Sequence, residues 1–257
     1  MAQAQLAIPE LPNLVSILAQ RIGHTSHFSQ FLLSWENSIF SLFAVFVISL
    51  FAYLASRKMG LVSTGRLQSI AEALVGAIDD FICGILGQQG RKYTPFIGTL
   101  FIYILFMNLL GLIPFMKSPT ASWSTTLGLA VCVFIYVQYT GIKELGFLGY
   151  LDHMMGRPRG MMALSLFIPV MMFFLHIISE LVRPISLSLR LRGNILGDDL
   201  LLTVLSGLGI KGIPFLLFST VLAIIASIIQ AVVFSLLTTI YFTLILTHDE
   251  EKREEVK

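Results

Sequence analysis

The ionisable residues between positions 179 and 202 lie inside a strongly apolar half of the chain. The stretch SELVRPISLSLRLRGNILGDDLLL holds three arginines and three acids, which are Arg183, Arg190, Arg192, Glu180, Asp198 and Asp199. A charge at bilayer depth costs about 2.5–3.5 kcal/mol on insertion scales. Charges in such a setting need a polar partner or a water-filled route, so the stretch predicts an ion pathway.

Arg190 is suited to an electrostatic task rather than to carrying protons. A guanidinium keeps its charge at every physiological pH. It can lower the pKa of a carboxylate that approaches it, and it repels hydronium, which would block a leak between two aqueous half-channels. We therefore predict that Arg190 is the centre of the site. One alternative stays open: the three arginines could form structural salt bridges with the three acids. This alternative applies more strongly to Arg183 and Arg192 than to Arg190.

A helix over this stretch would gather its polar groups on one face. At about 100° per residue, a narrow arc contains Arg183, Ser186, Arg190, Asn194 and Gly197. His176 borders this arc, and Glu180 and Asp198 lie on one flank. Asp199 and Arg192 point well away from it. The face thus combines a fixed cation with flanking groups that exchange protons.

The composition decides the class of protein that must position these residues. The chain is 56% hydrophobic and 12% charged, and its mean hydropathy is +0.84. Several apolar runs reach the ~20 residues that cross a bilayer core. We predict an all-α polytopic membrane protein forming a single membrane domain, residues 1–257, without a cleaved signal peptide. Cys83 and Cys132 fall in apolar helical patterns, so we expect no disulfide, metal site or cofactor.

The first 160 residues divide into an outer N-terminal segment, 1–35, and a region of upright spans, 36–160. The expected spans and the surface helix are 36–56, 64–88, 95–116 and 127–142. The amphipathic pattern of 64–88 favours the membrane surface, with a short buried helix as the alternative. Thr94 is the expected N-cap of the next span, with Pro95 at its first position. A lone Asn108 inside that span is typical of contacts between helices.

Residues 161–248 are too long for upright helices. A ~30 Å core accommodates about 20 residues at 1.5 Å each, and steep tilt accommodates the excess. Gly207, Gly209, Gly212 and Pro214 mark a compact turn, so we predict a strongly tilted hairpin followed by a charged tail, 249–257. Gln230 is the one amide of the second arm. In an antiparallel hairpin it can approach Arg190, or it can serve as structural glue between helices.

The placement of Lys and Arg predicts the orientation. With the N-terminus outside, Arg21, Lys117 and Lys211 lie on the outer side. The inner side then holds Arg57, Lys58, Arg66, Arg91, Lys92, Lys143, Arg157, Arg159, Lys252, Arg253 and Lys257. This excess predicts an outer N-terminus and a cytoplasmic C-terminus.

Together, four segments resemble subunit a of the F-type ATP synthase. They are PFIGTLFIYILFMNLLGLIPF, PTASWSTTLGLA, RPISLSLRLRGN and IIQAVVFSLLTTIY, and the likeness runs from about residue 90 onward. The resemblance implies a stator that conducts protons through two offset half-channels. Its implied partners are a ring of small proteolipid subunits (the c-ring), the peripheral-stalk subunit b, the remainder of the synthase and membrane lipid, with no nucleic acid.

The resemblance also implies roles for individual residues. Arg190 would be the essential arginine that faces the ring and separates the half-channels. Asn194 and Gln230 would lie beside it, and Asp198 and Asp199 would belong to the outer half-channel.

Three positions depart from the family's usual pattern. Arg192 stands where the family commonly has Phe, and it calls for an acid such as Asp199 or a lipid headgroup. His176 stands where many members have Glu, and Ala223 where some have an acid or His. These last two departures leave proton exchange to Asp198, Asp199, Glu180 and His176.

We thus expect a proton-conducting stator subunit of a bacterial plasma (inner) membrane, without catalytic chemistry of its own. A stand-alone ion-coupled secondary transporter or channel, with Arg190 as an anion site, is the alternative. No inverted repeat supports it, and co-purification with a proteolipid ring separates the two. A purely structural scaffold does not account for Arg190.

Overall fold

The computed structural model describes residues 15–17, 31, 35–56, 66–113, 116–146, 149–150 and 167–255, and these contain no strand. Most of the predicted N-terminal segment and the basic residues at 57–58, 157 and 159 lie outside these ranges. The α-helices are α3 (Glu36–Ser56), α4 (Arg66–Leu86), α5 (Thr94–Leu110), α6 (Trp123–Leu145), α8 (Phe167–Ser206) and α9 (Ile213–Glu255). Short 3-10 turns are η1 (Gly87–Lys92), η2 (Pro119–Ala121) and η3 (Gly209–Gly212).

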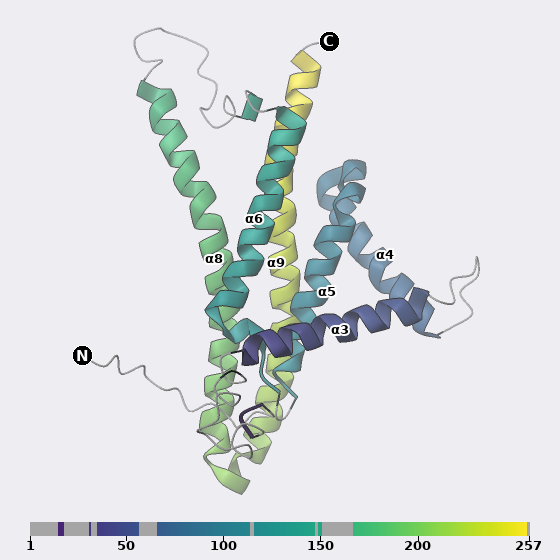
Figure 1. The fold of residues 1–257 in the computed structure, drawn as a ribbon, viewed down its shortest axis with the longest axis vertical. Helices are drawn as coiled ribbons and strands as arrows, with labels where there is room; N and C mark the ends of the chain where they lie inside the picture. The colour runs from purple at the N-terminus through teal and green to yellow at the C-terminus, as the bar shows by residue number, and fades with distance from the viewer. Residues whose placement is uncertain are drawn as a thin grey trace.

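The two longest helices, α8 and α9, form an antiparallel hairpin, as the sequence predicts (Figure 1). α8 has 40 residues and continues through Pro184, and α9 has 43 and includes most of the predicted charged tail. Gly209 makes the turn possible because its φ is +60°. At Gly212 a Cβ would collide with the backbone carbonyl of Leu205, so the chain can close tightly only with glycine there.

The core lies where α4, α5, α6, α8 and α9 meet. Tyr93 stacks on Phe242 at 4.7 Å between ring centroids, and Phe96 stacks on Tyr136 at 4.2 Å. Tyr136 in turn meets Phe242 edge to face. These rings join α5, α6 and α9 at one end of the bundle and fix the level at which the helices pass each other. In Figure 1, α6 lies between the arms of the hairpin at the end away from the turn.

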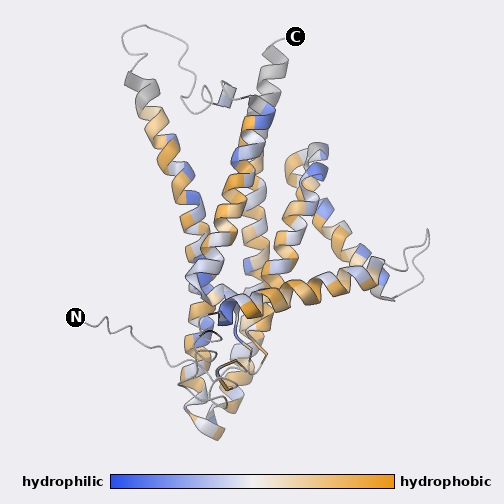
Figure 2. Cartoon of the chain, viewed as in Figure 1, coloured by the Kyte–Doolittle hydropathy of each residue, from blue (hydrophilic) through white to orange (hydrophobic). Residues whose placement is uncertain are grey.

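Within the described residues, four helical stretches are long and apolar enough to cross a membrane: Glu36–Ser56, Trp123–Glu144, Met171–Ser206 and Gly209–Ile245. Apolar residues predominate along these helices in Figure 2, and many are exposed, as expected for surfaces that contact lipid or partner subunits. The chain is therefore an all-α polytopic membrane protein. Figure 1 shows α3 lying at a large angle to the hairpin. If α3 stands upright, the hairpin is steeply inclined, as its length also requires.

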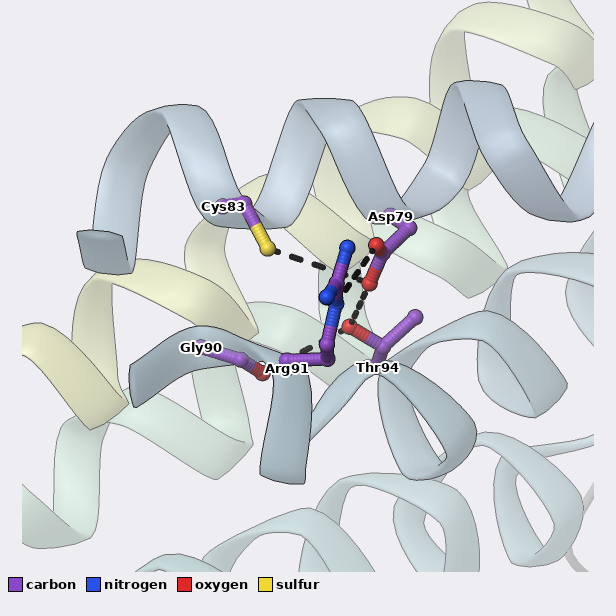
Figure 3. A network of polar contacts seen from close by, with 5 residues as sticks. All are labelled: Asp79, Cys83, Gly90, Arg91 and Thr94. Carbon is purple, nitrogen blue, oxygen red and sulfur yellow. Dashed lines mark hydrogen bonds and ion pairs between the residues drawn. The ribbon is translucent and has the colours of Figure 1, made fainter. Parts of the chain in front are cut away.

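A polar corner fixes α4 to the start of α5 (Figure 3). The Thr94 hydroxyl donates to Asp79 Oδ1 at 2.7 Å, and Arg91 Nε donates to Asp79 Oδ2 at 3.2 Å. Our assignment of Thr94 as the N-cap is therefore wrong. Tyr93 occupies the cap position without a side-chain bond, and the Thr94 hydroxyl is engaged by α4 instead. Pro95, predicted at the first helical position, is the second residue of α5 and lies in its first turn.

Helix boundaries agree with the sequence where apolar composition alone sets them. α3 covers the predicted 36–56. α5 ends at Leu110, several residues before the predicted 116, because a turn begins at Gly111. α6 starts earlier than predicted, since Ser122 caps it by accepting from the Thr125 N–H. In α4, Ile78 and Ile82 are buried in the core, but Ile70 and Leu74 are exposed, so its apolar contacts with the core come from its second half.

Candidate functional site

Arg190 lies on an open face of α8. Its side chain is exposed, as are Ser186, Gly193 and Gly197 on the same side of the helix. Among the described residues, no hydrogen bond or ion pair engages its guanidinium. The neighbouring face carries large exposed apolar residues, including Val182 and Leu189. A permanent cation is thus presented outward from an apolar surface, with small residues along the helix beside it.

Arg183, one of the predicted arc residues, is held inside the bundle instead. Its Nη1 donates to Glu180 Oε1 at 2.5 Å, and both side chains are largely buried, with 20% and 12% of their surface exposed. Arg183 also lies over the Tyr241 ring, 5.0 Å from its centroid. For this arginine the structural salt bridge that the sequence left open is the correct interpretation.

The second oxygen of Glu180 binds the neighbouring helix α6. Gln138 Nε2 donates to Glu180 Oε2 at 2.5 Å, and the Tyr150 hydroxyl donates to Gln138 Oε1. Burial, together with the nearby Glu180 carboxylate, raises the pKa of Tyr150 to about 12, so its hydroxyl remains a donor at neutral pH. A relay of hydrogen-bonding groups therefore leads from Tyr150 through Gln138 to a carboxylate on α8.

A small cavity of about 10 Å³, room for roughly one water molecule, adjoins this carboxylate. Its lining includes Glu180, Arg183, Pro184 and Tyr241. Pro184 has no N–H, so it cannot make the helical bond to the backbone carbonyl of Glu180. The proline thus leaves a backbone acceptor beside the cavity without interrupting α8.

His176 lies one turn before Glu180 and is half-buried. Its Nδ1 is 3.2 Å from the carbonyl of Met172. Because a carbonyl only accepts, this contact requires the proton on Nδ1, and the neutral ring then has Nε2 as its proton-accepting atom.

Arg192 faces away from Arg190, toward the start of α6. Its guanidinium lies over the Trp123 ring, 5.2 Å from the centroid, and its Nε is buried without a hydrogen-bond partner in the described part of the chain. Asp199, the acid expected to pair with Arg192, is not its partner in the structure. An aromatic face holds this cation instead, as cation–π geometry allows.

Asn194 and Gln230 lie at the same level of the hairpin. Arg183 and Tyr241 are in contact, and eleven residues along α8 and eleven back along α9 lead to Asn194 and Gln230. Within the described ranges, the amide nitrogens Asn194 Nδ2 and Gln230 Nε2 are both buried without a partner. No hydrogen bond joins Gln230 to Arg190 there, and Gln230 lies level with Asn194, one turn beyond Arg190 along α8, so the predicted approach of Gln230 to Arg190 stays a prediction.

Asp198 and Asp199 are half-buried in the last three turns of α8, near the hairpin turn. The backbone carbonyl of Asp199 accepts the Thr203 hydroxyl at 2.7 Å. In the described ranges, no three His, Cys, Asp or Glu side chains are grouped as they would be around a metal ion. The predicted site residues therefore separate into two groups, His176 and Glu180 toward one end of α8 and Asn194, Asp198, Asp199 and Gln230 toward the other.

Sequence reasoning missed Gln138, Tyr150, Trp123 and Tyr241. A signal for Gln138 was present, because it is the one amide inside an apolar run, which is the property that marked Gln230. The two aromatic partners of the arginines carry no such signal, since aromatic residues are common in membrane helices.

The sequence model of a known protein family matches this chain over most of its length. The model for "ATP synthase A chain" matches residues 38–243. The chain belongs to this family. ATP synthase subunit a from Protochlamydia amoebophila (strain UWE25) is 42% identical over 232 residues, covering 87% of this chain and 84% of the relative.

Two further relatives have the same printed name. ATP synthase subunit a from Solidesulfovibrio magneticus (strain ATCC 700980 / DSM 13731 / RS-1) is 39% identical over 173 residues, which are 67% of this chain and 69% of the relative. The Helicobacter acinonychis (strain Sheeba) protein of the same name is 43% identical over 162 residues, 63% of this chain and 67% of the relative. Family membership and the four apolar spans identify a multi-pass membrane subunit of an ATP synthase.

Proposed function

We propose that this chain is the stator of the synthase's membrane sector, with Arg190 separating two offset half-channels for protons. The observation that carries the proposal is the exposed guanidinium of Arg190 on the open face of the α8–α9 hairpin. No described residue forms a hydrogen bond or an ion pair with it. A buried cation satisfied within its own subunit could not serve a passing acid. A cation presented outward can, because it favours the ionised form of a carboxylate that comes near.

The partner that fits this face is a ring of small proteolipid subunits, each bringing a carboxylate. Such a carboxylate is neutral while it faces lipid, since burying an isolated charge there is costly. Beside Arg190 it ionises and gives up its proton. A membrane potential biases the exchange by about 2.3 kcal/mol per charge per 100 mV. The chain needs no catalytic chemistry of its own for this task.

The two groups of site residues supply the proton routes. With the N-terminus outside, α8 begins on the inner side. Glu180, held by Gln138 and adjoining a water-sized cavity, then belongs to the inner half-channel, with His176 one turn away. Asn194, Gln230, Asp198 and Asp199 belong to the outer one. Arg190 lies between the two groups along α8, which is the position a barrier to direct leakage requires. The peripheral-stalk subunit b and a bacterial inner membrane complete the setting.

The decisive experiment is Arg190→Ala in the whole synthase, reconstituted in sealed vesicles. We expect ATP-driven proton pumping and ATP synthesis to fall to background, while the ring still co-purifies with the subunit. Lys211→Ala is the matched control, because Lys211 is an exposed basic residue at the turn of the same hairpin. Normal pumping by an assembled Arg190→Ala complex would refute the proposal.

A further inference from the structure

An open groove lies between α3 and α5. With the N-terminus outside, the two helices meet in their outer halves, where Phe40 packs against Leu110 and the Ser41 and Tyr103 hydroxyls are 2.6 Å apart. Figure 1 shows α3 crossing α5 and then extending toward the start of α4. The groove has a volume of about 350 Å³. It is lined by one side of α3 between Val45 and Ala52 and by Phe96, Thr99, Leu100 and Tyr103 of α5.

The groove presents an almost entirely apolar surface. The Tyr103 hydroxyl is bound to Ser41, and the Thr99 hydroxyl donates to the Phe96 carbonyl at 2.8 Å, so both hydroxyls already have a partner. Buried water is held by polar groups that otherwise lack partners, and these two hydroxyls do not need it. At the depth of the hydrocarbon core, the expected occupant of such a groove is an apolar chain.

The shape of the groove does not fit a membrane-spanning helix. Such a helix is about 10–12 Å wide and crosses the full ~30 Å of the hydrocarbon core. The groove closes where Ser41 meets Tyr103, because helices in contact leave no room between them. At 1.5 Å per residue, Tyr103 lies about 16 Å along the helix from Lys92, close to the ~15 Å of hydrocarbon in one leaflet. A single acyl chain that enters from the inner leaflet fits a slot of this depth.

Two basic residues lie at the inner mouth of the groove. Lys92 is exposed, and it precedes Phe96 and Thr99 by four and seven residues, so the three share one helical face. Among the described residues, no hydrogen bond or ion pair engages the Lys92 ammonium. Arg91 has 76% of its side-chain surface exposed and binds Asp79 through Nε alone, which leaves both Nη nitrogens available (Figure 3).

We propose that the α3–α5 groove binds one anionic phospholipid of the inner leaflet. Its acyl chain fills the groove, and its phosphate lies against Lys92 and the Nη nitrogens of Arg91. The charges are complementary, because the cytoplasmic leaflet carries the anionic lipids and basic pockets between spanning helices on that side bind their headgroups. The bound lipid then supports the inner half of α3 against α5. The inference uses the orientation given in the proposed function and does not need the proton route.

Photo-crosslinking of the whole synthase in vesicles tests the proposal. The probe is phosphatidylglycerol with a diazirine on its acyl chain, and phosphatidylcholine with the same chain is the comparison lipid. Per assembled complex, we expect phosphatidylglycerol to label the groove peptides of α3 and α5 at least tenfold more than phosphatidylcholine does. Lys92→Gln should lower this label about fivefold, the contribution of one basic side chain near an anionic surface. The matched control is Lys143→Gln, because Lys143 is an exposed basic residue at the inner end of α6.

A second variant tests the groove independently of charge. Ala52 lines the groove, so Ala52→Phe fills the space of the acyl chain and should bring the phosphatidylglycerol label of the groove peptides down to the phosphatidylcholine level. Label elsewhere on the subunit should stay the same.

Three outcomes would overturn the proposal. Equal labelling by the two lipids, or equal loss in Lys92→Gln and Lys143→Gln, would show that the groove holds bulk lipid only. An absence of label from either lipid would show that a polypeptide fills the groove. These readouts are separate from transport, so an active Arg190→Ala complex refutes the proposed function and leaves the lipid site standing.

Discussion

Arg183 and Arg190 lie seven residues apart on one helix, on what the sequence presents as the same face, yet their surroundings differ completely. Arg183 is bound to Glu180 and covered by Tyr241. Arg190 is exposed, and no described residue pairs with it. The comparison teaches that the residue type of a charged side chain in an apolar helix does not by itself indicate a function. Its role depends on whether its own subunit satisfies it.

The largest expected effect that separates the two arginines is on stability. Removing one member of a buried ion pair leaves an unpaired charge and costs about 3–5 kcal/mol. Arg183→Gln should therefore lower the thermal midpoint at which the subunit is lost from the purified synthase, and Glu180→Gln added to it should recover most of the loss. Arg190→Gln is the matched comparison and should lower that midpoint less, because it removes only a contact with a partner subunit and leaves no charge buried and unpaired. An equal loss for both arginines would remove the distinction.

An intermediate effect concerns Arg192, which resembles neither of the other two. Its contact with Trp123 should contribute about 1 kcal/mol, as cation–π pairs do. A double-mutant cycle of Trp123→Leu and Arg192→Met measures this coupling in the thermal midpoint of the synthase. Additive effects of the two changes would show that the Trp123 ring does not stabilise the Arg192 cation. An acid or a lipid headgroup would then be the expected partner of Arg192.

The smallest expected effect is at the α4–α5 corner, far from the hairpin. The Thr94 hydroxyl, with help from Arg91, lowers the pKa of Asp79. A lowered pKa means that the ionised form stabilises the corner, so this stabilisation is present above about pH 4 and is lost as pH falls through the folded pKa. Hydrogen-exchange protection of η1 and the start of α5, corrected for intrinsic rates, should be constant from pH 7 to 5. Asp79→Asn should lower it at pH 7, and a steady decline between pH 7 and 5 in the unaltered chain would contradict the assignment.

Much of the fold follows from patterns that depend on neighbouring residues alone. Apolar length predicts α3 to the residue, and the glycines predict the hairpin turn. Thr94 shows where such reasoning stops. Its position before Pro95 is typical of a cap, but a carboxylate fifteen residues earlier engages the hydroxyl. Local preference is weak enough for a single tertiary hydrogen bond to override it.

The sequence singles out the candidate residues, whose role in transport stays a proposal, but it does not predict which of them pair. Arg190 follows from its charge and setting, and Gln230 from being a lone amide. The bonds from Gln138 and Tyr150 to Glu180 could not be predicted, because they depend on how α6 passes α8. The helical projection placed Arg183 on the same face as Arg190. In the structure, neighbouring helices cover Arg183 and leave Arg190 exposed. A projection describes one helix and contains no information about what packs against it.

The open setting of Arg190 also bears on how the subunit is made and kept. Before its partner arrives, an inserted copy exposes that guanidinium to hydrocarbon, at a cost of about 2.5–3.5 kcal/mol. Under the proposed function, binding the ring removes this penalty, so the guanidinium that we propose to serve transport would also favour correct assembly. Orphaned copies are consequently strained, and cells lacking the proteolipid should clear them faster than they clear an Arg190→Leu copy.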